Sequence, residues 1–319
     1  MELTLIIALF LLGIVFIVKG GDLFVDAAAW MAEVSGIPKL IIGATIVSLA
    51  TTLPEMLVSV MAAVQGKVDM SIGNAVGSVT ANLGLILAIS IICMPGVIRR
   101  RDYLAKTVLM LGASVLVVVS GLMGQVGLST SLVLLAVFAV FLFENVTSAV
   151  HALGAEGGGK ASRIPVEKRV LVRNLLKFAV GTVGIVWGAD LLVDNGSELA
   201  RLVGISERVI GVTVIAVGTS LPELITTLTA IIKKQSSLSV GNILGANIID
   251  LTLILPISAL VSGKALPIGA GSSALDLPAC LLVGAIALLP TMATKKFHRW
   301  QGVLLLAIYA GYVFLTCTA

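Results

Sequence analysis

Long apolar stretches recur along the whole chain, separated by short polar breaks. A stretch of about 20 residues lets a helix cross roughly 30 Å of hydrocarbon, and nothing alternates with the period of two typical of a membrane β-barrel. The pattern predicts an all-α protein with ten membrane-spanning helices, at 3–33, 38–64, 70–96, 104–124, 129–151, 170–202, 208–232, 238–262, 273–290 and 300–317. The first and sixth exceed an upright span, so we expect them to tilt or extend beyond the membrane.

Composition and charge agree with a multi-pass protein of the cell membrane. The chain is 58% hydrophobic and 12% charged, with a mean hydropathy of +1.12, which excludes an ordinary soluble domain. The net charge of +4 does not point to nucleic acid, because sixteen Lys and Arg lie at odd-numbered connections and four at even-numbered ones. This positive-inside bias predicts extracellular N and C termini and a cytoplasmic linker at 153–169.

One short motif occurs twice. "ATTLPEMLV" (50–58) matches "GTSLPELIT" (218–226) at an offset of 168, and the ungapped comparison of 20–90 with 188–258 gives 26 identities in 71 pairs. The chain therefore reads as a five-helix repeat at 1–152, the linker, and a second repeat at 170–319, with cation-binding motifs at 43–90 and 211–258. Because five is odd, we expect the second repeat to be inverted, with a site where the two repeats meet.

A proline and a glutamate interrupt one apolar helix of each repeat. Pro54 and Pro222 each remove a backbone donor and displace the carbonyl four residues earlier. An ionised Glu55 or Glu223 costs from about 2.5 kcal/mol at the bilayer centre, so each needs a partner. No Lys or Arg lies deep in the neighbouring spans. Two carboxylates balance one divalent charge, and an all-oxygen set favours Ca²⁺ over Zn²⁺ or Cu⁺.

Polar residues of the third and eighth spans complete the candidate site. "GNAVGSVTANLG" (73–84) and "GNILGANIIDLT" (241–252) have glycines four apart, which allows close helix packing. These spans present Ser78 with Asn82, and Asn247 with Asp250. Four further acids, Asp22, Asp26, Asp190 and Asp194, are expected near helix ends or along an aqueous entrance.

These motifs resemble the Ca²⁺/cation antiporter superfamily, specifically its prokaryotic sodium/calcium exchanger branch. The resemblance covers nearly the whole chain, which lacks the "GNAxE"-like signature of the proton/calcium branch. It implies ten helices, four central cation sites, and two long helices, the first and sixth spans, that slide to expose the sites alternately to each side.

The resemblance also implies roles for individual residues. Thr51, Glu55, Thr219 and Glu223 match the Ca²⁺ ligands. Sodium would share the glutamates and add the side chains of Thr52, Ser78 and Ser220 and the carbonyls of Ser48 and Ala216, with Asn82, Asn247 and Asp250 flanking. Two departures stand out, because Ala246 replaces a frequent serine and Ala50-Thr51-Thr52 replaces Gly-Thr-Ser. They bear on sodium coupling and leave the calcium ligands intact.

The expected function is a secondary active antiporter that exports Ca²⁺ in exchange for Na⁺ by alternating access. An H⁺/Ca²⁺ antiporter that protonates the same carboxylates is the alternative; an ion channel is a further class. An intramembrane protease is disfavoured by the lack of an "HExxH" motif. We expect a non-enzyme without cofactors, whose partners are Ca²⁺, Na⁺ and the bilayer, with no nucleic acid and no obligatory protein partner, so that a monomer suffices.

Overall fold

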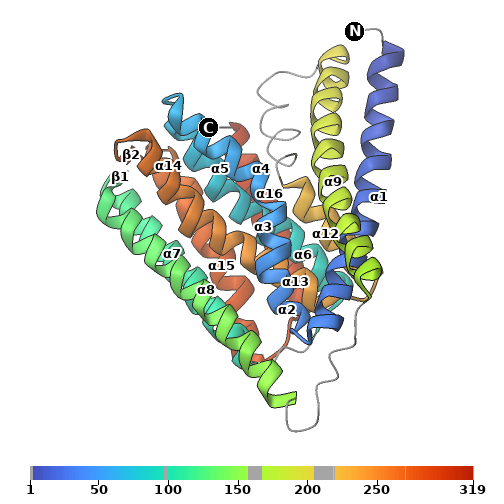
Figure 1. The fold of residues 1–319 in the computed structure, drawn as a ribbon. Helices are drawn as coiled ribbons and strands as arrows, with labels where there is room; N and C mark the ends of the chain where they lie inside the picture. Colours follow the sequence, from blue (N-terminus) through green and yellow to red (C-terminus); the bar gives the residue numbers. More distant parts are fainter. Residues whose placement is uncertain are drawn as a thin grey trace.

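The chain is built almost wholly of helices (Figure 1). The computed structural model describes residues 3–96, 100–156, 167–204, 218, 220–269 and 271–318. The first half contains α1 (Leu3–Ser35), α2 (Lys39–Ile42), η1 (Gly43–Val47), α3 (Ser48–Thr51), α4 (Leu53–Val64), α5 (Val68–Ala81), η2 (Asn82–Leu87), α6 (Ala88–Cys93), α7 (Arg100–Leu122) and α8 (Leu128–Glu156). The second contains α9 (Lys168–Leu202), α12 (Leu221–Ile232), α13 (Ser236–Ile249), η4 (Asp250–Ile254), α14 (Leu255–Ser262), η5 (Ser272–Asp276), α15 (Leu277–Thr294) and α16 (Arg299–Thr318). Segments named η are π-helical.

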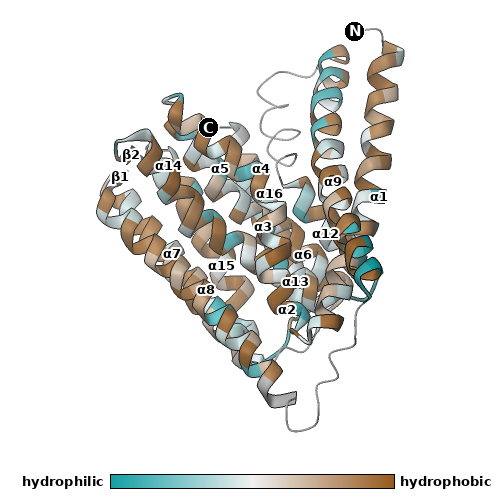
Figure 2. Cartoon of the chain, viewed as in Figure 1, coloured by the Kyte–Doolittle hydropathy of each residue, from teal (hydrophilic) through white to brown (hydrophobic). Residues whose placement is uncertain are grey.

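Several of these helices can cross a membrane. Among the described residues, seven are long and apolar enough, and the bent pair Lys39–Thr51 and Leu53–Val64 makes up to eight. Figure 2 shows hydrophobic residues along most of α1, α7, α8 and α15, whereas α9 also carries many hydrophilic residues. The chain is therefore a multi-pass membrane protein. A helix lies within each of the ten predicted segments, but the count of ten spans and the extracellular termini remain predictions.

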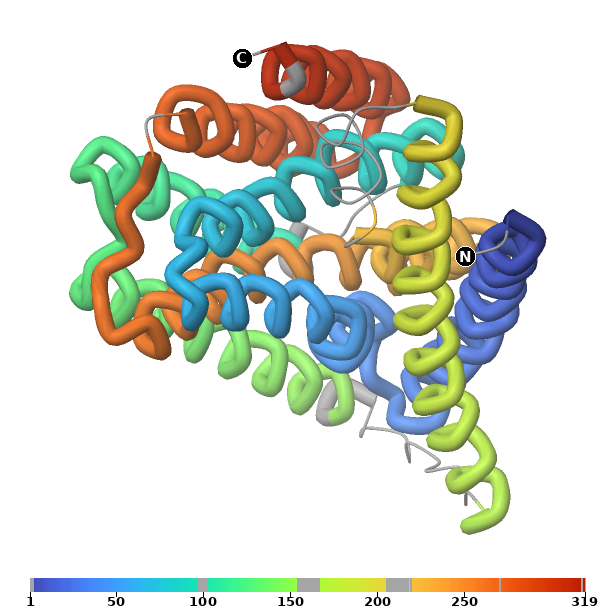
Figure 3. Tube along the Cα trace, turned by 90° about the horizontal axis from the view of Figure 1, so that it is seen from above, coloured from blue at the N-terminus to red at the C-terminus, as the bar shows by residue number. Residues whose placement is uncertain are grey.

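The two longest helices pack against each other at one flank of the molecule. Figures 1 and 3 show α1 and α9 side by side there. Glycines allow their backbones to touch, since a Cβ added at Gly20 would lie 2.8 Å from the nitrogen of Ile185, and one at Gly181 would lie 2.7 Å from the nitrogen of Phe24. The pair contacts the rest of the protein mainly through α12 and α2.

The core of the molecule is centred on α5 and α13. Every residue of α13 from Leu238 to Ile249 is buried, and the apolar side chains of α5, η2 and η4 join it in one continuous cluster with α7 and α15. Helices buried on all sides are normal in the interior of a helical bundle. The polar residues carried by these helices are therefore held away from lipid.

The offset of 168 found in the sequence also relates elements of the fold. It carries the bounds of α4 onto those of α12 and the bounds of α5 onto those of α13, and it carries Asn82, where η2 begins, onto Asp250, where η4 begins. This correspondence supports the duplication that we infer from the sequence; the inverted orientation of the repeats remains an inference.

A short β-ribbon joins the two halves, and the sequence pattern did not predict it. Strand β1 (Gln125–Val126) pairs antiparallel with β2 (Leu266–Pro267), so that Val126 lies opposite Leu266. The ribbon links the α7–α8 connection to the segment after α14, near one end of the bundle (Figure 1).

Candidate cation site

A helix break places Glu55 inside the protein. The axis bends by 47° between Lys39–Thr51 and Leu53–Val64, where Pro54 stands in the first turn of α4 and cannot donate to the carbonyl of Ala50. Beyond the break the amide of Met56 bonds to the carbonyl of Thr52 at 3.0 Å. Glu55, in that first turn, is only 1% exposed. The predicted break thus sets a carboxylate in the protein interior.

The second repeat begins its helix in the same way. Pro222 lies in the first turn of α12, the amide of Leu224 bonds to the carbonyl of Ser220 at 3.0 Å, and Glu223 is 0% exposed. Ser220 is also buried. Two residues predicted to belong to this site, Ala216 and Thr219, lie outside the described residues.

The two glutamates lie close enough to interact electrostatically, and the charge of Asp250 also acts on Glu55. Within the part of the chain that the structure describes, Glu55 Oε2 and both carboxylate oxygens of Glu223 have no hydrogen-bond donor. The ion pairs between described residues include neither glutamate. Buried charges of one sign are costly unless an opposite charge neutralises them. The geometry therefore suits a cation between Glu55 and Glu223.

The hydroxyls beside the first glutamate are buried and face inward. The Thr51 hydroxyl lies near Glu223 and donates to Oδ1 of Asn242 at 3.2 Å. The carbonyl of Ser48 accepts bonds from the Thr51 hydroxyl, at 3.3 Å, and from the Thr52 hydroxyl. A hydroxyl hydrogen rotates readily, so both threonines can offer a lone pair to an ion, and the Ser48 carbonyl would be freed if their hydrogen bonds to it broke.

Two asparagines support the glutamate-bearing helices, and the sequence analysis did not assign them a role. The Asn74 amide donates to the carbonyl of Glu55 at 3.1 Å and to Oγ of Ser59 at 2.9 Å. The Asn242 amide donates to Oγ1 of Thr226 at 3.0 Å. The signal was present, because a Gly-Asn pair occurs at 73–74 and again at 241–242.

A second polar group lies where the π-helical segments begin. The Asn82 amide donates to Oδ1 of Asn247 at 3.0 Å. Asp250 is 0% exposed, and no described residue donates to either of its carboxylate oxygens. Asp250 also interacts electrostatically with Glu223. Ser78 is buried on α5, but no bond from its side chain to this group is seen among the described residues. π-Helical turns are frequent at functional sites, and here they begin at Asn82 and Asp250.

Close backbone contact brings the two halves together beside these residues. A Cβ added at Gly43 would lie 2.3 Å from the carbonyl oxygen of Leu238, and one at Gly245 would lie 2.4 Å from that of Ala44. Only glycine permits such an approach. This close crossing holds Ser48 beside Gly245 and Thr51 beside Asn242.

A small cavity of about 100 Å³ leads toward the break in the first repeat. Its lining residues include Pro54, Gly218 and, from α9, Asp190 and Asp194. The latter two acids were expected near helix ends or along an aqueous entrance, and both lie within α9 at this cavity. Their counterparts on α1, Asp22 and Asp26, instead pair with Lys233 at 3.2 and 2.7 Å.

The described residues contain no group of three or more His, Cys, Asp or Glu side chains arranged to hold a metal ion by themselves. Carboxylates from two helices therefore need hydroxyl, amide or carbonyl oxygens to complete a coordination shell. Such a mixed oxygen set is the preference of Ca²⁺, which takes 6–8 oxygen ligands at about 2.3–2.6 Å.

Known proteins are similar to this chain in sequence and in fold. The family profile described as "Sodium/calcium exchanger protein" matches residues 5–146 and 174–318. Inner membrane protein YrbG of Escherichia coli is 34% identical over 93% of this chain and 92% of its own length. Sodium/calcium exchanger MaX1 of Methanosarcina acetivorans is 29% identical over 98% of each chain. A structure of the sodium-calcium exchanger NCX_Mj, soaked with 10 mM Na⁺ and 10 mM Sr²⁺, superposes with a TM-score of 0.80 at 30% identity over 97% of both chains.

Proposed function

This chain belongs to the sodium/calcium exchanger family, and on that premise we propose that it exports Ca²⁺ in exchange for Na⁺ by alternating access. The family membership and the likeness to NCX_Mj make it a cation/Ca²⁺ antiporter. The observation that carries the finer proposal is the pair Glu55 and Glu223, which are buried and interact with each other, and which form no ion pair with a described Lys or Arg.

Calcium would lie between the two glutamates. Their charges balance one divalent ion, and the hydroxyls of Thr51 and Thr219 would add neutral oxygens. Support comes from the burial of Glu55, Glu223 and Thr51 and from the unpartnered carboxylate oxygens. A hard cation prefers such a set.

Sodium ions would use the same carboxylates together with neighbouring neutral oxygens. We assign to this role the side chains of Thr52, Ser78 and Ser220 and the carbonyls of Ser48 and Ala216, with Asn82, Asn247 and Asp250 flanking. The described members of this set are all buried. Because both ions need Glu55 and Glu223, binding of one excludes the other.

Competition for the carboxylates would make exchange obligatory. A carrier that reoriented empty would move uncompensated acids through the hydrocarbon, at a cost of about 2.5 kcal/mol or more for each acid. Reorientation would involve α1 and α9, whose glycine-lined contact forms one flank of the molecule. Each ion shifts this equilibrium only by its different affinity for the two states.

Transport into inverted membrane vesicles tests the coupling ion. With pH and membrane potential clamped, an outward-directed sodium gradient from the vesicle lumen should drive Ca²⁺ uptake. Imposing H⁺ and K⁺ gradients one at a time provides the comparison. Uptake that follows only the pH gradient would remove the sodium proposal and leave calcium antiport standing.

One observation favours proton coupling as a second candidate. Asp250 is a third buried acid whose oxygens have no donor, so it could carry a proton when Ca²⁺ leaves. Asp250→Asn should retain Ca²⁺ binding and sodium-driven uptake if protons are not the coupling ion. Loss of only the pH-driven component would favour the proton mechanism.

A further inference from the structure

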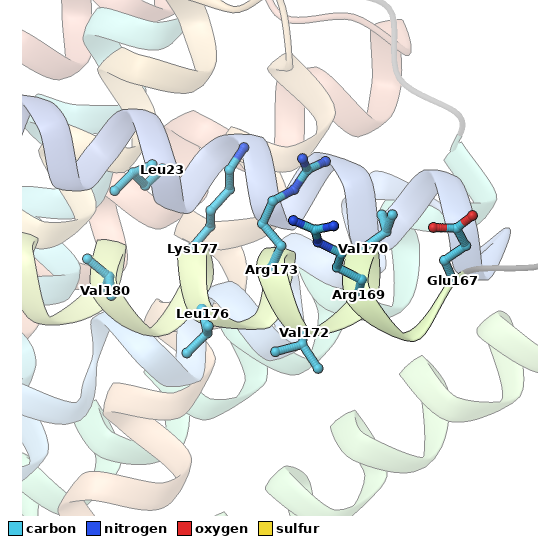
Figure 4. A pocket seen from close by; sticks show the side chains of 9 residues that line it. All are labelled: Leu23, Glu167, Arg169, Val170, Val172, Arg173, Leu176, Lys177 and Val180. Carbon is cyan, nitrogen blue, oxygen red and sulfur yellow. The ribbon is translucent and has the colours of Figure 1, made fainter.

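The amino-terminal part of α9 carries a basic stripe that the cation site does not use. Arg169, Arg173 and Lys177 are spaced four residues apart, so they share one face of the helix. Figure 4 shows these three side chains projecting from the same side of α9. The helix has 35 residues, about 52 Å at 1.5 Å per residue, whereas hydrocarbon is roughly 30 Å thick. An upright α9 would thus extend about 22 Å beyond the hydrocarbon, and a tilted α9 somewhat less.

The stripe borders a cavity of about 760 Å³. Leu23 of α1 contributes to its wall, and Glu167 carries the only carboxylate among the lining side chains that the structure describes. Three cations and one acid leave a net charge of +2. The ion pairs formed between described residues include none of these three cations. The cavity is thus suited to an anionic group.

An apolar stripe runs beside the basic one. Val172, Leu176 and Val180 also line the cavity, and all three are largely exposed. A soluble anion would make no favourable apolar contact with these side chains, whereas an acyl chain would remove them from water. The linker residues 157–166 include Lys160 and Arg163 and no acid, so they do not supply the complementary charge.

We propose that this cavity binds one anionic phospholipid. Its phosphate lies against Arg169, Arg173 and Lys177, and an acyl chain lies along Val172, Leu176 and Val180. Charge complementarity and the adjoining apolar stripe carry the assignment. Basic clusters at the predicted cytoplasmic end of a span attract anionic lipids with about 1 kcal/mol per side chain. The proposal does not depend on which ion drives transport.

Native mass spectrometry of the full-length protein tests the proposal. Phosphatidylglycerol and phosphatidylcholine with identical acyl chains are added to the delipidated protein. We expect preferential retention of phosphatidylglycerol. Each substitution Arg169→Gln, Arg173→Gln or Lys177→Gln should weaken it about five-fold, from about 1 kcal/mol per cation. The single substitution Lys296→Gln removes one positive charge from another exposed connection, as each test variant does, and should leave retention unchanged.

Three results would overturn the proposal. Equal retention of the two lipids would show that the cavity does not select a negative headgroup. Unchanged retention in all three single variants would place the lipid elsewhere. Displacement of phosphatidylglycerol by inorganic phosphate, with no loss on Leu176→Gln, would show a soluble-anion site instead. Variants are compared only when they elute as a single species and unfold at the wild-type temperature. Because these substitutions lie on an exposed helix face, we expect each variant to fold like the wild type.

Discussion

Asn82 and Asn247, which come from opposite halves of the chain, are joined by a hydrogen bond of 3.0 Å between Nδ2 and Oδ1. Both side chains are buried, and Asp250 stands one helical turn after Asn247. The bond links the beginning of η2 to α13 beside the two glutamates. It is therefore a structural tie between the halves at the level of the candidate site.

Removing this tie should destabilise the protein. Asn247→Ala leaves the Asn82 amide buried without its acceptor, which costs about 1–3 kcal/mol. Thermal unfolding in detergent should show a lower midpoint. Asn145→Ala is the matched control, since Asn145 is equally buried but bonds only to the carbonyl of Phe141 in its own helix. Equal effects of the two substitutions would argue against a role for the bond between the halves.

Neutralising one glutamate should abolish calcium binding. Glu223→Gln keeps the shape of the side chain but leaves one carboxylate to face a divalent ion. Removing one partner of a buried charge pair costs about 3–5 kcal/mol, so the affinity should fall about 100-fold or more. Calorimetric titration with Ca²⁺ measures it. Glu33→Gln, at an exposed acid paired with Lys39, should bind like the wild type. Wild-type affinity in Glu223→Gln would contradict the assigned site.

Ion pairs of Lys233 with Asp22 and Asp26 link the end of α12 to α1. Partial burial lowers the pKa of Lys233, but hydrogen bonds and the charges of Asp26 and Asp22 outweigh this, and its pKa lies above the ordinary 10.5. The stabilisation is thus complete at neutral pH and is lost as pH rises through the raised pKa.

Lys233→Gln should cost about 0.2–1 kcal/mol for each exposed ion pair lost. Thermal unfolding at neutral pH measures the change. In Asp26→Asn the further substitution of Lys233 should cost less than it does in the wild type, because one of its partners is already absent. Full additivity of the two substitutions would show that the pair does not interact.

The sequence predicts local features well. Apolar stretches of about 20 residues predict the membrane helices because the bilayer imposes that length. Pro54 and Pro222 predict the interruptions because each lacks a backbone donor, and the structure begins α4 and α12 at those points. The burial of Glu55 and Glu223 follows from their place inside apolar segments.

Contacts between distant residues could not be predicted in the same way. The predicted span at 104–124 includes Lys106, whose side chain is only 1% exposed and pairs with Glu144 at 2.9 Å. A salt bridge satisfies the buried amine, and only the folded arrangement of α7 and α8 reveals its partner. The bond from Thr51 to Asn242 likewise spans 191 positions. Hydropathy carries no information about such pairs.

The contact between α1 and α9 offers a test of the proposed movement. A Cβ added at Gly20 would lie 2.8 Å from the nitrogen of Ile185 and 2.9 Å from the carbonyl oxygen of Gly181. Gly20→Ala must therefore push the helices apart, which in a packed interface costs about 1–3 kcal/mol. We expect slower exchange in proteoliposomes with unchanged Ca²⁺ affinity, because the ligands lie on other helices. Gly112→Ala is the control, since Gly112 is exposed on α7 with open space around its Cβ position. Equal exchange rates in the two variants would show that transport does not depend on this contact.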